Sequence, residues 1–199
     1  MNVVELLTGD LCRLRFIPRF QLCHRIHDES VAEHSFYCAT YALLLAMDVE
    51  SQGYVVDVPL VVTKALLHDA EECITGDIPR PVRYHSTEFA EAIDEFATNA
   101  FAVLINNLGL RGSVVEKIIL TWEYAKKGGD LESEIVRFAD FLCVLSYLAL
   151  EVEGSNKTMQ RHVTEMNKYL GSFRYEMGHP LYSAMNQAHG LLNRVMKGA

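Results

Sequence analysis

The chain has 199 residues, half of them hydrophobic, which is the usual size of one compact domain with a sizeable core. Its 26 acidic and 18 basic residues give a formal net charge of −8, and no cluster of Lys and Arg stands out. This balance argues against a nucleic-acid polymer as partner, because a phosphate backbone requires a basic surface. A small anion is not excluded, since a few placed Arg residues and a cation can bind one phosphate group.

Nothing in the sequence indicates a membrane or an oxidising compartment. The first residues lack the basic start, long apolar run and cleavage site of a signal peptide. The longest apolar runs, such as YALLLAM, are far short of the ~20 residues of a membrane span. The five Cys are odd in number and have no CxxC spacing, which predicts reduced, buried thiols. We therefore expect a cytoplasmic protein with no membrane partner and a single domain over residues 1–199.

Apolar residues recur at steps of three and four along the chain, whereas alternating β-type runs are nearly absent. This is the period of amphipathic helices, so the pattern predicts an all-α fold. The clearest helix starts after Ser30, because Glu33 three residues later completes a capping box. We expect this helix to run to about Val49.

A second helix is predicted to start at Asp57, with Pro59 in its first turn. It would carry VVTKALLHDAEECI and end near Thr75 and Gly76. The IPRPVRY segment that follows is predicted to be non-helical, because a proline disfavours helical geometry in the residue before it. Further helices are expected at residues 87–109, 113–126 and 131–153, and the final stretch containing 157–170 and 180–197 should add one or two more.

Ionisable residues stand out on the second predicted helix, which is otherwise rich in Ala, Leu and Val. His68, Asp69 and Glu72 lie within about one turn of one another. Burying such groups without partners is costly, whereas a bound cation would stabilise them.

Two more polar residues are predicted to point into the core. His34 lies on the apolar face of the first helix, and Asp140 lies within the apolar run IVRFADFLCVLSYLAL. A carboxylate in such a helix needs a partner, because Asp is almost never fully buried alone. The structural alternative is that Asp140 pairs with Arg137 or another basic residue and that His68 simply packs in the core.

Together, His34, His68, Asp69 and Asp140 provide two imidazoles and two carboxylates. Such a mixed nitrogen and oxygen set suits a divalent transition metal, namely Co²⁺, Mn²⁺, Zn²⁺, Fe²⁺ or Ni²⁺, and leaves a position open for catalysis. A structural zinc site would more often be closed by Cys and His at a different spacing.

Four motifs occur in the order of a known family. Across roughly residues 10–150, the sequence contains CRLRFIPRF, ESVAEHS, LLHDAEECITGDIPRPVRY and VRFADFLC. In this respect it resembles the 5′-deoxynucleotidase branch of the HD-domain phosphohydrolases, and it is also similar to compact viral HD-domain dATP triphosphohydrolases. The resemblance implies a single-domain HD-domain helical bundle, a homodimer and a deoxynucleotide substrate.

The resemblance also implies roles for individual residues. His34, His68, Asp69 and Asp140 are implied as the metal ligands, the same four that burial suggests. Glu72 is implied as the proton-transfer residue and, with Asp69, forms the predicted catalytic set.

The predicted substrate-binding set lies in two loops. Arg19 is implied as a phosphate contact and Asp77 as a contact to the sugar hydroxyl, and we assign Thr75 and Pro79 of the same loop to this set. Phe20 stands where the family has Trp. Phe keeps an aromatic wall at this position but lacks the indole N–H of Trp. The alternative for Arg19 is a solvated surface residue.

The sequence leaves the reaction open between two hydrolyses. A 5′-deoxynucleotidase would release phosphate from a deoxynucleoside 5′-monophosphate, whereas a dNTP triphosphohydrolase would release triphosphate. Arg80, Arg83 and Lys64 are the cations that could bind additional phosphates, or they are ordinary solvated charges. Alternatives of other classes are a non-catalytic nucleotide-binding regulator and a purely structural helical module.

Overall fold

The computed structural model describes residues 1–197, and its regular structure is helical, as the sequence predicts. The elements are, in order, α1 (Val3–Thr8), the 3₁₀ helix η1 (Asp10–Phe16), α2 (Val31–Ser51), α3 (Val58–Leu67), α4 (Glu72–Thr75), α5 (Arg80–Arg83), α6 (Thr87–Asn107), α7 (Gly112–Lys127), α8 (Leu131–Glu153), the 3₁₀ helix η2 (Lys157–Met159), α9 (Gln160–Leu170) and α10 (Tyr182–Lys197). None of the helices within this described part is long and apolar enough to cross a membrane.

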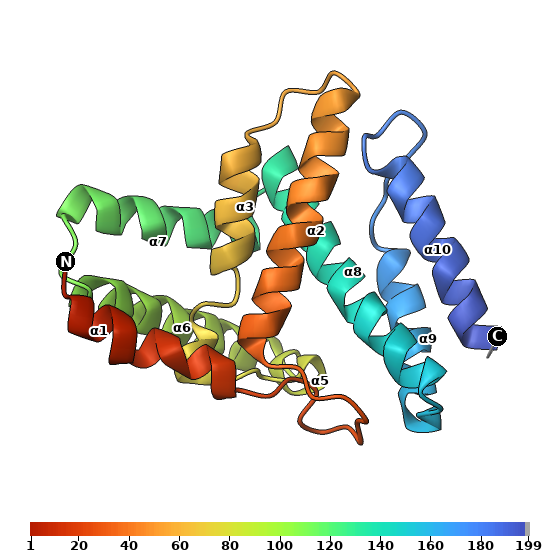
Figure 1. The fold of residues 1–199 in the computed structure, drawn as a ribbon, viewed down its shortest axis with the longest axis horizontal. Helices are drawn as coiled ribbons and strands as arrows, with labels where there is room; N and C mark the ends of the chain where they lie inside the picture. The colour runs from red at the N-terminus through yellow and green to blue at the C-terminus, as the bar shows by residue number, and fades with distance from the viewer. Residues whose placement is uncertain (198–199) are drawn as a thin grey trace.

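The helices form two groups around a central trio. Figure 1 shows α2, α3 and α8 in the middle of the molecule, with α6 and α7 on one side and α9 and α10 on the other. The larger apolar cluster joins the central trio to α9 and α10, and its members include Ala65. The smaller cluster joins α6 and α7 to the segment after α3, and its members include Ala70 and Cys73. His68 and Asp69 therefore lie between two apolar clusters.

The predicted capping box begins α2. The Ser30 hydroxyl accepts a hydrogen bond from the Glu33 N–H at 3.2 Å, and the Glu33 carboxylate accepts one from the Ser30 N–H at 2.8 Å. Two unpaired N–H groups at the start of the helix are satisfied in this way. The box fixes the first turn of α2, where His34 follows.

The prediction of one helix from Asp57 to Thr75 is wrong. Helix α3 ends at Leu67, and a turn separates it from the single turn of α4. The backbone bonds in this turn span three residues, as when the Ala70 N–H donates to the Leu67 carbonyl at 3.0 Å. In a helix, successive side chains point about 100° apart. In this turn, Asp69 instead contacts His34 of α2, and Glu71 contacts Trp122 of α7.

The prediction that IPRPVRY is non-helical is also wrong, because α5 forms one helical turn there. Pro79 is its N-cap and Pro81 lies in the first turn. A proline costs little at that position, since the first N–H groups of a helix have no partner within it. The other predicted helices lie within about two residues of α6, α7, α8 and α10. The predicted helix at 157–170 is divided into η2 and α9, and α1 and η1 were not predicted.

All five cysteines are free thiols, as predicted. Cys38, Cys73 and Cys143 are buried, but Cys12 and Cys23 are only partly buried, so the prediction of burial is wrong for those two.

The loop before α2 is fastened to the end of α8 by a buried carboxylate. Glu151 is fully buried and accepts hydrogen bonds from the backbone N–H groups of Ile26 at 2.9 Å and His27 at 2.7 Å. The Asn156 amide donates a third bond to it at 2.5 Å. Burial alone would raise the pKa of Glu151, but these hydrogen bonds lower it below its ordinary value.

We expect Glu151→Gln to lower the free energy of unfolding by about 1–3 kcal/mol at pH 7, because an amide N–H would face backbone donors. Urea unfolding measures this, and Glu153→Gln, an exposed neighbour, is the control. Since the folded-state pKa of Glu151 is lowered, its contribution is present above the unfolded pKa and is lost as the pH falls through the folded pKa. An equal loss of stability at neutral and at strongly acidic pH would contradict this role.

Candidate active site

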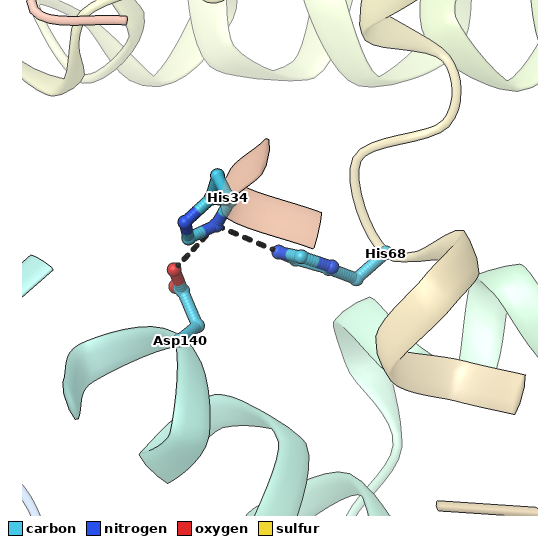
Figure 2. A group of neighbouring side chains, drawn as sticks. All are labelled: His34, His68 and Asp140. Atoms are coloured by element: carbon cyan, nitrogen blue, oxygen red, sulfur yellow. Dashed lines mark hydrogen bonds and ion pairs between the residues drawn. The ribbon is translucent and has the colours of Figure 1, made fainter. Parts of the chain in front are cut away.

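Three side chains from distant parts of the sequence converge between α2, α3 and α8. Figure 2 shows His34, His68 and Asp140 pointing toward one another, and their ligand atoms all lie within 4.8 Å of one another. The Nε2 atom of His34 is 3.2 Å from the Nε2 atom of His68 and 3.2 Å from the Oδ1 atom of Asp140. Three of the four predicted metal ligands thus form one compact cluster.

Asp69, the fourth predicted ligand, lies at the edge of this cluster. Its Oδ2 atom is 3.0 Å from His68 Nε2 and 3.4 Å from His34 Nε2. It contacts both imidazoles but does not belong to the three-residue group within 4.8 Å. The structure therefore brings all four residues together, with Asp69 on one side.

The donor chemistry of the cluster fits a divalent transition metal. His68 Nδ1 lies 2.7 Å from the Ala65 carbonyl, so this nitrogen carries a proton, and in the neutral imidazole Nε2 offers its lone pair to the cluster. Burial lowers the pKa of His68, but the Asp69 and Asp140 carboxylates raise it, and the net value is about 9. Burial raises the pKa values of Asp69 and Asp140, yet the two imidazoles bring both values below the ordinary value of Asp.

In the structural alternative for Asp140, Arg137 is not the partner, because it donates instead to the Gly128 carbonyl at 2.5 Å, but another basic residue, Arg19, acts on Asp140 through its charge. The basic partner of the cluster is Arg19, which is not the solvated surface residue of the other alternative. Its guanidinium lies 3.0 Å from the Glu29 carboxylate and 2.6 Å from His34 Nδ1, and its side chain is only 12% exposed. Glu29, which holds Arg19 in place, was missed by the sequence analysis because an acid before a capping residue is common.

The contact of Arg19 with His34 has a chemical consequence. A neutral imidazole has one nitrogen that accepts and one that donates. If His34 Nδ1 accepts the Arg19 N–H, Nε2 carries the proton and cannot bind a metal ion. Metal ligation by His34 therefore requires Arg19 to leave Nδ1, which frees the guanidinium for a substrate anion.

Phe20 lies beside Arg19 in a left-handed backbone conformation, with φ 54°. Its ring stacks on Tyr147 with 4.4 Å between centroids, and the Arg19 guanidinium lies 5.3 Å from the ring centroid. Phe20 is thus held by Tyr147 of α8 and by Arg19.

Glu72, the predicted proton-transfer residue, carries an unsatisfied buried atom. No hydrogen-bond partner for its Oε2 atom exists among residues 1–197. Burial raises its pKa well above the ordinary value, and the negative charges of Asp69 and Asp77 raise it further. A carboxyl group with a raised pKa is suited to hold a proton and give it up to a reacting group.

The loop after α4 contains the other predicted substrate residues. Asp77 is partly buried, and burial raises its pKa, although Arg19 and the Phe20 backbone oppose the rise. Thr75 donates its hydroxyl proton to the Gly76 carbonyl at 3.0 Å, and Pro79 caps α5. Asp77 thus faces the Arg19–Phe20 loop, whereas the Thr75 hydroxyl is engaged by the backbone.

The predicted additional cations are mostly engaged elsewhere. Lys64 is buried against Asp130 and Ser133, with bonds of 2.7 and 2.8 Å, so its prediction as a spare phosphate ligand is wrong. Arg83 pairs with Asp94. The guanidinium of Arg80 lies 4.7 Å from the Tyr169 ring centroid and 5.2 Å from that of Tyr84.

The sequence and the fold of this chain are similar to those of known proteins. The family described as 5′-deoxynucleotidase YfbR-like matches residues 7–179. The chain belongs to the YfbR-like family. A curated 5′-deoxynucleotidase of Citrobacter koseri is 30% identical over 170 residues, which cover 83% of this chain and 82% of the relative. A 5′-deoxynucleotidase of Pasteurella multocida is 26% identical over 185 residues, covering 86% and 93%.

Solved structures confirm the predicted HD-domain fold of this YfbR-like chain. An HD-domain phosphohydrolase of Listeria innocua superposes with a TM-score of 0.80 at 23% identity, covering 99% of this chain and 93% of the other. A cyanophage S-2L HD phosphohydrolase, DatZ, bound to dA and one catalytic Zn²⁺ ion, superposes with a TM-score of 0.56 at 16% identity, covering 96% and 97%.

We expect Asp140→Asn to weaken Co²⁺ binding by more than about tenfold, because an anionic ligand is lost. Glu153→Gln, at the end of the same helix, is the control.

Since the pKa of His68 is about 9 without metal, metal binding must release the His68 proton, and Co²⁺ affinity should fall as the pH falls below that value. Competition with a chromophoric chelator measures both effects. An affinity that is flat between pH 7 and 9 would argue against His68 as a ligand.

Proposed function

We propose that this protein is a metal-dependent 5′-deoxynucleotidase that hydrolyses deoxynucleoside 5′-monophosphates to the deoxynucleoside and phosphate. Membership of the YfbR-like family supports the reaction. The observation that carries the assignment to particular residues is the convergence of two imidazoles and two carboxylates beside the partly buried Glu72 and Arg19. The four converging residues are His34, His68 and Asp140, with Asp69 at the edge.

In this proposal, His34, His68, Asp69 and Asp140 hold the metal ion. A divalent ion in that position supplies Lewis-acid chemistry, polarising phosphoryl oxygens and making water more acidic. The native ion is one of Co²⁺, Mn²⁺, Zn²⁺, Fe²⁺ or Ni²⁺, and elemental analysis of protein purified without chelator tests which.

The remaining residues act on the substrate. Arg19 moves from His34 to the phosphate and neutralises its charge. Glu72 gives its proton to the leaving sugar oxygen, or takes one from the attacking water, at a carboxyl atom without a hydrogen-bond partner in the described chain. Asp77 accepts a hydrogen bond from the sugar hydroxyl, and Phe20 forms the wall beside the sugar. Thr75 and Pro79 shape the loop that carries Asp77.

The number of available cations favours one phosphate group over three. Of the predicted phosphate ligands, Arg19 alone contacts the metal cluster, whereas Lys64 and Arg83 are paired with Asp130 and Asp94, and Arg80 lies against the rings of Tyr84 and Tyr169. A triphosphate would bring more negative charge than one guanidinium and one divalent ion neutralise. The dNTP triphosphohydrolase therefore remains the second candidate, and a regulator without turnover is disfavoured by the presence of Glu72.

Incubation of the metal-loaded protein with dAMP and with dATP separates these candidates. We expect phosphate and deoxyadenosine from dAMP, and triphosphate release from dATP would overturn the proposal.

Glu72→Gln should reduce kcat by about 10²–10⁴-fold, because proton transfer is lost. Glu91→Gln on the exposed face of α6 is the control.

We expect Arg19→Met to raise KM for dAMP without weakening metal binding. The variant loses the phosphate cation, yet it also removes the N–H that occupies His34 Nδ1. Kinetics and Co²⁺ affinity measured on the same preparation test both halves. A loss of metal affinity would contradict the proposed movement of Arg19.

The chain also fits a cytoplasmic homodimer with no membrane or nucleic-acid polymer as partner. Its thiols are free, and α2 exposes the large apolar side chains Phe36, Leu44 and Met47. Such a face is typical of protein interfaces. Sedimentation equilibrium tests the dimer.

A further inference from the structure

The turn that carries His68 and Asp69 ends in a buried acid outside the set of proposed ligands. Glu71 is only 1% exposed. Its Oε2 atom accepts a hydrogen bond from the Trp122 indole N–H at 2.8 Å, and its Oε1 atom forms an ion pair with the Lys126 ammonium. Both partners lie on α7, four residues apart, so they face the turn from one side of that helix.

The partners of Glu71 are themselves fixed. The Trp122 ring is 3% exposed and stacks on Phe101 with 4.6 Å between centroids. The Lys126 ammonium lies 4.9 Å from the centroid of the same indole. The carboxylate is therefore held by two donors from a helix that the smaller apolar cluster locks in place.

The backbone near the ligands needs such a tether. Helix α3 ends at Leu67, and α4 is a single turn, so regular helical hydrogen bonding does not continue through residues 68–71. His68 and Asp69 are thus positioned by a turn, and the side chain of Glu71 fastens that turn to α7. Without Lys126, the buried charge of Glu71 would also add to that of Asp69.

We propose that Glu71, clamped by Trp122 and Lys126, is a positioning residue that orients His68 and Asp69 toward the metal. This rests on the proposed function, because it presumes the metal site. Metal sites need their ligands within about 0.5 Å of the productive geometry, and residues behind the ligands typically change metal affinity about 10–100-fold.

Lys126→Met tests the clamp by removing the ion pair. Lys126 borders a cavity of about 400 Å³, which leaves room for the substitution. Lys127→Met is the matched control, because Lys127 is 68% exposed and pairs with Asp94 rather than with Glu71. Glu71→Gln is a milder second variant, since an amide oxygen can still accept from the Trp122 indole.

Three readouts separate positioning from stability: Co²⁺ affinity, the visible absorption spectrum of the Co²⁺ protein, and kcat and KM for dAMP. We expect Lys126→Met to lower Co²⁺ affinity about 10–100-fold, to alter the Co²⁺ spectrum and to lower kcat with little change in KM. Lys126→Arg should restore most of the affinity, and Lys127→Met should match the wild type.

Wild-type Co²⁺ affinity and spectrum in folded Lys126→Met would overturn the proposal, even if urea unfolding shows lost stability. If that variant does not fold, the same result for Glu71→Gln overturns it. If Lys126→Met alters the Co²⁺ spectrum but the wild type does not hydrolyse dAMP, the result would support the positioning role of Glu71 and contradict the proposed substrate. A wild type that binds no Co²⁺ would overturn both.

Discussion

Two buried imidazoles and several buried or partly buried carboxylates lie at the junction of two apolar clusters, and their burial constrains the structure around them. Each charge would be costly there without a partner. His68 has the Ala65 carbonyl, Arg19 has Glu29 and His34, and Glu71 has two donors on α7. These partners come from α2, α3, α7 and the loop before α2, so the polar junction ties together the parts of the fold that the apolar clusters leave separate.

The same junction explains where the helices break. A continuous helix through HDAEE could not give His68, Asp69 and Glu71 their separate partners, because its side chains would follow a fixed rotation of about 100° per residue. The turn after Leu67 lets the two ligands face α2 and α8 while Glu71 faces α7. Residues 68–71 are therefore held more by side-chain contacts than by helical backbone hydrogen bonds, and α7 helps to position the active site through Glu71.

One acid and one cation remain available for chemistry. Glu72 keeps a buried oxygen without a hydrogen bond from the described residues, and Arg19 makes contacts that an anion can replace. The loop that carries Arg19 is secured at some distance by Glu151, so the guanidinium can move while the loop stays in place. In the proposed reaction, these two residues handle the proton and the phosphate charge.

The sequence by itself determined the all-α class, the capping box before His34 and the candidate cluster, because helical periodicity is local and unpaired buried charge is visible as a polar residue in an apolar run. It also carried the family motifs. Only the tertiary structure decided that Lys64 pairs with Asp130, that Arg19 contacts His34, and that Glu71 meets Trp122 and Lys126. These are contacts between residues 15 to 66 positions apart, and no local propensity specifies which distant side chain a buried charge will meet.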